Sequence, residues 1–181
     1  KIDYASHAND GGTVLREVLD FDNAIKVAYD FYMQHPDETL IVVTADHETG
    51  GMALGNSDYT LNLKVLAEQK CSSDLLSDQL SALQKEAGER LTWEQVREVI
   101  SKNTGLYAEV EMSEEDDQLL QAAFAQMIQH QGVEKSLYKD INALASKALA
   151  LLNQKSRLGW TSKGHTASAV PVFAIGVGAE R

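Results

Sequence analysis

The sequence contains a single cysteine, Cys71, which excludes both an internal disulfide bond and a cysteine-rich zinc site. It has no run of about 18 apolar residues, so a transmembrane helix is excluded. Basic residues are few, with 16 Lys and Arg against 27 Asp and Glu and a formal charge of -11. This balance argues against a general nucleic-acid-binding protein and against a polybasic protein at a membrane surface. An anionic substrate is not excluded, because bound cations can reverse the local charge of a site.

The chain nevertheless has the composition of a folded protein. Its 181 residues are 44% hydrophobic and 24% charged, which fits one globular domain or a large part of one. The chain begins at Lys1 without a methionine or a signal peptide. An apolar run at residues 172–177 is followed only by a few residues that end at Arg181. We interpret the chain as a fragment of a larger protein.

Residues 1–55 form the first of three segments and are expected to contain a loop, a helix and a strand. Asp20 or Asp22 can cap a helix that starts near Phe21 and ends before Pro36. The β-branched, apolar run at residues 39–45 is typical of a parallel strand that is covered on both faces. A helix followed by a buried strand indicates an α/β core.

Residues 56–155 contain no proline and show helical periodicity, which predicts a mainly helical insertion with its own small core. Two capping-box patterns begin at Thr92 and Ser113. Further helices are expected from Ser73 or Asp74 towards Lys85, and from Tyr138 to Asn153. Residues 156–181 then provide a core loop and a strand at residues 172–177. The predicted fold is α/β: a partial three-layer sandwich with a mostly parallel sheet that contains both strands, plus the helical insertion.

Asp46 and His47 directly follow the first predicted strand. Ligands of open α/β sheets bind at the carboxyl ends of strands, and a buried aspartate is costly unless it is paired or bound to a metal. The pattern therefore favours a metal or catalytic site. The alternative is that Asp46 accepts hydrogen bonds from loop amides and that His47 lies on the surface.

Asp3 and His7 are four residues apart, so one helical turn would place both on one face, where they could share a zinc or manganese ion. Taken alone, this spacing is more typical of a structural role. His165 lies in a glycine-bracketed loop at residues 159–165, which by itself indicates an exposed histidine. We assign no function to His35 or His130.

Taken together, three motifs resemble those of a known family. Residues 40–51, Leu-Ile-Val-Val-Thr-Ala-Asp-His-Glu-Thr-Gly-Gly, resemble the metal-binding signature of alkaline phosphatases. Residues 2–10 resemble the Asp-x-x-x-His zinc motif of that family, and residues 161–166 resemble the loop that carries its last zinc histidine. The motifs occur in the family's order, whereas the middle segment matches none of them.

The resemblance implies that Asp3, His7 and His165 ligate one zinc ion and that Asp46 and His47 ligate a second. Two such ions can stabilise the attacking and leaving oxygens of a displacement at phosphorus. The resemblance also implies a magnesium ion, a serine nucleophile, a bridging aspartate and a phosphate-binding arginine, all contributed by an N-terminal part that precedes this chain. We therefore assign no catalytic and no magnesium-binding residue here, and we expect the fragment alone to be inactive.

Our leading interpretation is the C-terminal part of a bacterial-type, zinc-dependent phosphomonoesterase that acts on phosphate monoesters. One alternative is a related hydrolase of the same superfamily, a phosphodiesterase or a sulfatase-like enzyme. Another is a non-catalytic interaction module whose metal residues are vestigial. The resemblance also implies a periplasmic or secreted location and a parent protein that, as is common in the family, is a homodimer.

Overall fold

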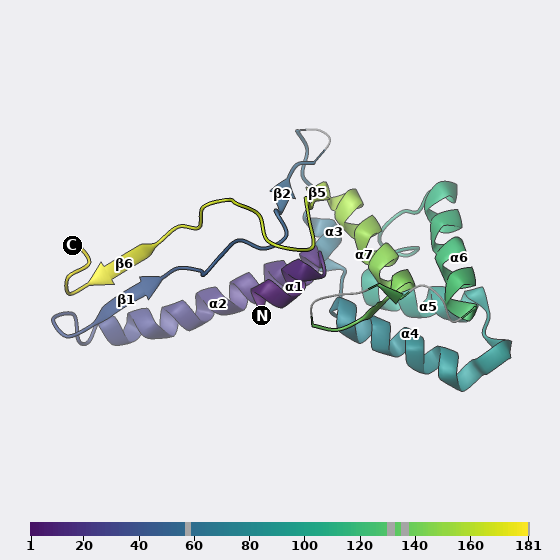
Figure 1. The fold of residues 1–181 in the computed structure, drawn as a ribbon, viewed down its shortest axis with the longest axis horizontal. Coiled ribbons are helices and arrows are strands. Elements are labelled where there is room, and N and C mark those ends of the chain that lie inside the picture. The colour runs from purple at the N-terminus through teal and green to yellow at the C-terminus, as the bar shows by residue number, and fades with distance from the viewer. Residues whose placement is uncertain (57–58, 130–132, 135–137, 181) are drawn as a thin grey trace.

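A computed structural model describes residues 1–56, 59–129, 133–134 and 138–180, and it consists of an extended arm and a helical body (Figure 1). The helices are α1 (Ile2–His7), α2 (Gly11–Tyr32), α3 (Lys64–Ala67), α4 (Ser73–Ala87), the 3-10 helix η1 (Gly88–Arg90), α5 (Trp93–Thr104), α6 (Glu114–Ile128) and α7 (Ala143–Ser156). The strands are β1 (Leu40–Val43), β2 (Ala53–Leu54), β3 (Val133–Glu134), β4 (Ile141–Asn142), β5 (Leu158–Gly159) and β6 (Phe173–Gly176). None of the described helices is long and apolar enough to cross a membrane. His130 lies outside the described residues.

The arm consists of α2, β1 and β6 (Figure 1). Strands β1 and β6 pair with each other, which confirms that the two predicted runs share a sheet, but they are antiparallel, with Leu40 opposite Gly176 and Val43 opposite Phe173. All three sheets in the described part of the chain are two-stranded and antiparallel. The expected mostly parallel arrangement was therefore wrong, and a three-layer sandwich is not confirmed. The expected burial of the strand on both faces was also wrong, because β1 alternates exposed and half-buried residues and β6 is mostly exposed. An apolar run indicates a tendency towards burial, but it specifies neither the covering layer nor the direction of the partner strand.

Helix α2 starts ten residues earlier than the sequence predicts, at Gly11 rather than near Phe21. Asp10 caps it by accepting a hydrogen bond from the backbone N–H of Thr13 at 3.1 Å, so the prediction of a cap at Asp20 or Asp22 was wrong. Glycine disfavours the helical conformation, so the pair Gly11-Gly12 predicts a loop rather than the start of a helix.

Close packing explains why glycine occupies the first turn of α2. A Cβ atom on Gly11 would lie 2.3 Å from Cδ2 of Leu158, and one on Gly12 would lie 2.3 Å from Oε1 of Gln69. The first turn is thus pressed against the helical body, while the rest of α2 runs out along the arm (Figure 1). Helix α1 precedes this contact and lies where the arm meets the body.

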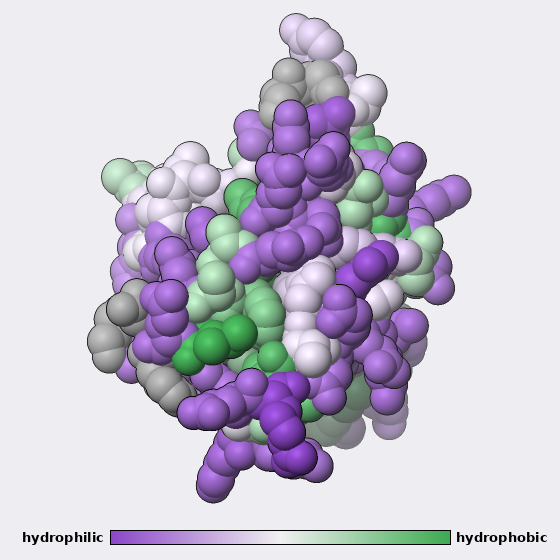
Figure 2. All heavy atoms as spheres, turned by 90° about the vertical axis from the view of Figure 1, so that its right-hand side faces the viewer, coloured by the Kyte–Doolittle hydropathy of each residue, from purple (hydrophilic) through white to green (hydrophobic). Residues whose placement is uncertain are grey.

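The helical body has the main hydrophobic core. Leu80 of α4, Ile100 of α5, Leu120 of α6 and Leu144 of α7 are all fully buried there. Both predicted capping boxes are present, at the starts of α5 and α6. Helix α4 agrees closely with its prediction, whereas α7 begins at Ala143 rather than Tyr138 because Asn142 caps it. Figure 2 shows that hydrophilic side chains cover most of the outer end of this body.

The arm, by contrast, exposes apolar side chains along its length. Helix α2 and the two strands leave large hydrophobic residues accessible: Val18, Leu19, Phe21, Val27, Tyr29, Phe31, Leu40, Val42, Phe173 and Ile175. Within the described residues, the sheet of β1 and β6 is contacted by α2 but has no second helical layer. The arm therefore adds little to the buried core.

Candidate metal centre

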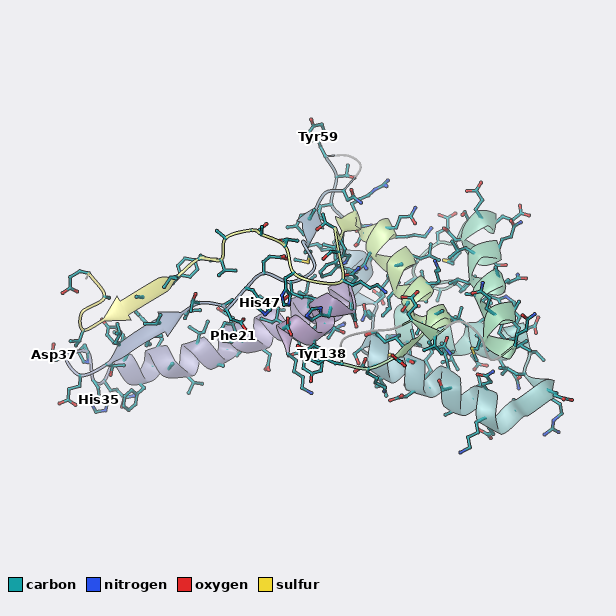
Figure 3. The ribbon with its side chains drawn as sticks, in the orientation of Figure 1. Phe21, His35, Asp37, His47, Tyr59 and Tyr138 are labelled. Carbon is teal, nitrogen blue, oxygen red and sulfur yellow. The ribbon has the colours of Figure 1, made fainter. Side chains whose placement is uncertain are left out.

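The five residues singled out by sequence come from three places that meet at the junction of arm and body. Helix α1 carries Asp3 and His7, the segment after β1 carries Asp46 and His47, and the loop after β5 carries His165. A cleft of about 660 Å³ lies beside α1, and Asp3, Asp46 and His47 are among the residues that line it. In Figure 3, His47 lies close to α1, whereas His35 lies at the distal end of the arm.

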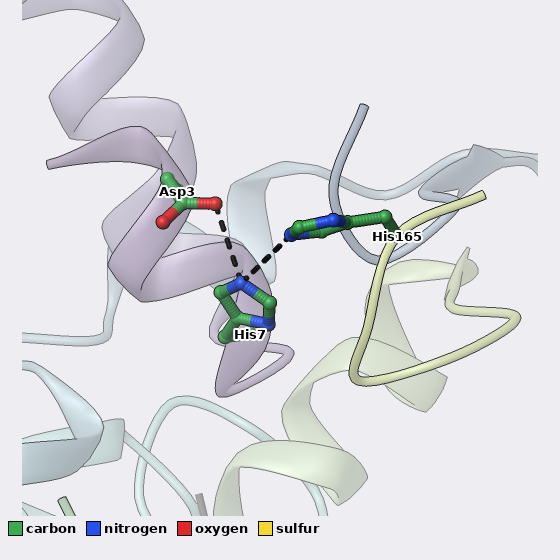
Figure 4. A group of neighbouring side chains, drawn as sticks. All are labelled: Asp3, His7 and His165. Atoms are coloured by element: carbon green, nitrogen blue, oxygen red, sulfur yellow. Dashed lines mark hydrogen bonds and ion pairs between the residues drawn. The ribbon is translucent and has the colours of Figure 1, made fainter. Parts of the chain in front are cut away.

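Asp3, His7 and His165 form one compact cluster (Figure 4). The Nε2 atoms of His7 and His165 are 3.3 Å apart, and the Nε2 atom of His7 is 3.4 Å from Oδ1 of Asp3. One potential ligand atom from each residue lies within 4.8 Å of the other two. His7 is buried, with 4% of its side chain exposed, whereas His165 is exposed. The cluster therefore brings two imidazole nitrogens and a carboxylate to one point.

A backbone contact fixes the tautomer of His7. Its Nδ1 atom is 2.6 Å from the carbonyl oxygen of Lys163. A carbonyl oxygen can only accept a hydrogen bond, so Nδ1 must carry a proton and donate it. In the neutral ring, the lone pair is then on Nε2, which faces Asp3 and His165. This is the usual arrangement of a metal-binding histidine, whose second nitrogen donates to a carbonyl or carboxylate group.

Two hydroxyl groups hold the carboxylate of Asp3. Thr49 Oγ1 donates to Oδ1 at 2.7 Å, and Tyr138 Oη donates to Oδ2 at 2.6 Å. Burial alone raises the pKa of Asp3, but these hydrogen bonds and the nearby histidines bring its pKa below the usual value. The same bond to Asp3 is the largest cause that raises the pKa of Tyr138 to about 12. At neutral pH the pair is therefore an ionised carboxylate and a phenol donor.

Asp46 and His47 lie next to this cluster. The His47 ring stacks on the His165 ring with centroids 3.6 Å apart, and His47 Nε2 is 3.4 Å from Oδ2 of Asp46. His47 Nδ1 is 3.2 Å from the carbonyl oxygen of Glu48, which again places the lone pair of the neutral ring on Nε2. The Asp46 side chain is 87% exposed. Asp46 and His47 therefore offer two ligands, and within the described residues they do not form a group of three with another side chain.

The donor set suits zinc. Zinc binds imidazole nitrogen and carboxylate oxygen, and a catalytic zinc site typically has three protein ligands and an open position. In the structure, Nε2 of His7 lies 3.3 Å from Nε2 of His165 and 3.4 Å from Oδ1 of Asp3. Asp3, His7 and His165 supply three ligands from two segments, so their chemistry fits such an ion. The pair of Asp46 and His47 would need a further ligand.

Sequence reasoning missed three side chains that support these residues: Glu48, Thr49 and Tyr138. Glu48 accepts hydrogen bonds that join its own loop to the loop of His165, and the hydroxyl of Thr166, the largest cause, lowers the pKa of Glu48. Glu48 and Thr49 lie within the motif of residues 40–51, so membership of that motif was the sequence signal that could have identified them. Nothing in the sequence indicates that Tyr138, which is 135 residues from Asp3, reaches the site.

Comparisons with known proteins identify the family. The sequence model of the alkaline phosphatase family matches residues 1–181. Alkaline phosphatase 4 of Bacillus subtilis (strain 168) is 30% identical over 182 residues, which cover 100% of this chain and 34% of that protein. The repressible alkaline phosphatase of Saccharomyces cerevisiae is 28% identical over 183 residues, which cover 96% of this chain and 29% of that protein.

A crystal structure of a cold-active alkaline phosphatase from a psychrophilic Shewanella species is also similar. It superposes with a TM-score of 0.73 at 30% sequence identity, over 99% of this chain and 38% of that chain. The chain spans about a third of the length of the curated relatives and matches their C-terminal part. Since the family model matches every residue, the chain belongs to the alkaline phosphatase family.

Proposed function

We propose that this chain is the C-terminal part of a zinc-dependent phosphomonoesterase that hydrolyses phosphate monoesters. The observation that carries the proposal is the cluster of Asp3, His7 and His165, in which two Nε2 atoms face each other at 3.3 Å. In this proposal the cluster holds one zinc ion, and Asp46 and His47 contribute to a second. Bound zinc ions would supply Lewis-acid chemistry, lowering the pKa of an oxygen nucleophile and stabilising charge on the leaving oxygen.

In this proposal, the residues of this chain bind the metal ions and orient the ligand atoms. His7 directs Nε2 into the cluster because the Lys163 carbonyl group holds its Nδ1 proton. Asp3 stays ionised and fixed between Thr49 and Tyr138. The stacking of His47 on His165 places the two proposed ligand groups side by side. Preorganisation of this kind lets a site stabilise developing charge without reorganising during the reaction.

Other parts of the proposal lie outside the described chain. The serine nucleophile, the magnesium ligands and the phosphate-binding arginine would come from the N-terminal part of the longer protein. The 181 residues alone would then lack phosphatase activity, because the effects of removing members of a catalytic unit are far from additive. We also propose that residues 56–155 are an insertion between segments 1–55 and 156–181. The resemblance supports a periplasmic or secreted location and a homodimeric parent protein.

The test is metal content together with activity. We expect the folded, zinc-equilibrated 181-residue chain to retain at least one zinc ion per molecule after dialysis, and the His165→Ala variant to lose it. His35→Ala is the matched control, because His35 lies at the far end of the arm (Figure 3). In the longer protein, p-nitrophenyl phosphate hydrolysis should require zinc and should be abolished by His165→Ala. A folded chain that holds no zinc, or hydrolysis unaffected by His165→Ala, would refute the proposal.

A further inference from the structure

Glu48 joins the two loops that carry His47 and His165. We name these the His47 loop (residues 46–51) and the His165 loop (residues 160–166). Oε1 of Glu48 accepts a hydrogen bond from the backbone N–H of Gly51 at 2.6 Å, within the His47 loop. Oε2 accepts from the backbone N–H of Thr166 at 3.0 Å and from the hydroxyl of Thr166. One carboxylate therefore satisfies three donors on two loops that are more than 100 residues apart in the sequence.

These contacts fix the residue that follows His165. On the other side of His165, the carbonyl oxygen of Gly164 accepts a hydrogen bond from the N–H of Gly50 at 2.8 Å. His165 is thus bracketed by two attachments to the His47 loop, one through Gly164 and one through Thr166. The side chain of His165 itself is exposed, so core packing does not determine its direction. Its approach to His7 therefore depends on the bracketing contacts and on the stacking of its ring on His47.

We propose that Glu48 is a positioning residue for His165: its carboxylate holds Thr166 so that the His165 imidazole faces His7 and stacks on His47. The inference rests on the proposed function, because it concerns how a zinc ligand is presented. Glu48 does not act as a ligand itself, since both of its oxygens already accept hydrogen bonds from N–H and O–H groups. Charge-assisted bonds of this kind are stronger than neutral ones, which suits a carboxylate at this position.

Zinc affinity is the first readout. We expect Glu48→Ala to weaken zinc binding tenfold to a hundredfold, as is typical when a group that orients a metal ligand is removed. Glu48→Gln keeps the shape of the side chain and one acceptor oxygen, so its zinc affinity should lie between those of Glu48→Ala and the unaltered chain. Thr166→Val should also weaken zinc binding, and the double variant with Glu48→Ala should bind no more weakly than Glu48→Ala alone, because the hydroxyl bond that Thr166→Val removes is already lost in Glu48→Ala. Competition with a chromophoric chelator measures each affinity. Glu98→Gln, on the exposed face of α5, is the control and should bind as the unaltered chain does.

A metal-free readout separates this inference from the proposed function. The proton NMR signal of the His165 ring, identified with the His165→Asn variant, should be displaced in the zinc-free chain because the ring stacks on His47 at 3.6 Å. In Glu48→Ala it should shift towards the value of a free histidine, while far-ultraviolet circular dichroism stays unchanged. If the unaltered chain binds no zinc but this shift occurs, the proposed function fails and the positioning role stands. If the His165 signal and zinc affinity of Glu48→Ala equal those of the unaltered chain, the positioning role is wrong.

Discussion

The Nε2 atoms of His7 and His165 lie 3.3 Å apart, although 158 positions separate the two residues in the sequence. His7 cannot donate from this nitrogen in its neutral form, because the Lys163 carbonyl group holds its proton on the opposite side of the ring. Two nitrogens at this distance are favourable either when His165 donates an Nε2 proton to His7 or when both nitrogens bind one cation. Asp3, whose pKa is lowered, adds a negative charge at the same point. The arrangement supports the proposed metal site.

Tyr138→Phe tests whether the hydroxyl bond to Asp3 contributes to metal binding. The aromatic ring stacks on Tyr4 with centroids 3.7 Å apart, and phenylalanine preserves this stacking while removing the 2.6 Å hydrogen bond. We expect zinc affinity to fall about tenfold, at the lower end of the effect typical of such supporting groups. Chelator competition measures it. Tyr59→Phe, on an exposed residue of the loop between β2 and α3 (Figure 3), should leave zinc affinity unchanged, and an equal loss in both variants would contradict the assignment.

Leu80→Ala tests the core of the helical body. Leu80 on α4 is 0% exposed and belongs to the main hydrophobic cluster. Truncating a buried leucine leaves a cavity and typically costs about 2–5 kcal/mol of unfolding free energy. Urea unfolding measures the change. Leu75→Ala, on the same helix at 49% exposure, is the matched control and should cost less than about 1 kcal/mol.

Gly12→Ala should destabilise the protein, although alanine usually stabilises a helix relative to glycine. Alanine normally stabilises a helix interior by up to about 1 kcal/mol relative to glycine. Here its Cβ would lie 2.3 Å from Oε1 of Gln69, whose amide donates to the buried carboxylate of Asp10 at 2.6 Å. We expect the clash to displace Gln69 and to lower the melting temperature. A higher melting temperature in Gly12→Ala would show that α2 does not pack against the body as described.

Lys155→Met tests the ion pair between α6 and α7. Lys155 Nζ donates to Oδ2 of Asp116 at 2.6 Å. Burial alone raises the pKa of Asp116, but the bonds from Lys155 and Ser113 bring its pKa below the usual value. A lowered folded-state pKa stabilises the protein above the unfolded pKa of about 4, and this stability is lost as the pH falls through the folded value.

The variant should therefore be less stable than the unaltered chain at pH 6, by about 1 kcal/mol, and the difference should shrink towards pH 2. Urea unfolding at both pH values measures it. Lys102→Met, on an exposed residue of α5, serves as the control, and a deficit of Lys155→Met that is the same at both pH values would exclude the pair as its cause.

Cys71 provides a second pH-dependent signal. Burial, followed by the charge of Asp10, raises the pKa of its thiol to about 11. The thiolate is the reactive form, so alkylation by iodoacetamide should be slow at pH 8 and should rise about tenfold per pH unit up to about pH 11. In the urea-unfolded chain the rate should level off near pH 9. Because the folded-state pKa is raised, the corresponding stability is present below the unfolded pKa and is lost as the pH rises. Identical profiles for folded and unfolded chains would contradict this environment.

The sequence predicted the features that depend on neighbouring residues. The capping boxes at Thr92 and Ser113 use groups three residues apart, and the placement of Asp3 and His7 on one face of α1 needs only one helical turn. Residue spacing alone did not predict contacts between distant segments: the approach of His165 to His7 was implied only by the family resemblance, and β1 and β6 were expected in one sheet but in the wrong relative direction. The start of α2 at Gly11 depends on Leu158, and the support of Asp3 by Tyr138 depends on how the body folds back onto α1.

The order of these segments along the chain has a consequence for biosynthesis. Helices α4 and α5, and then α6 and α7, contact one another over short sequence separations, so the helical body can form early. The proposed zinc ligands, by contrast, come from residues on both sides of that body. His165 emerges from the ribosome only after α3 to α7 have been synthesised. On the proposed function, a zinc ion held by Asp3, His7 and His165 could therefore gain its third ligand only after the body has been translated.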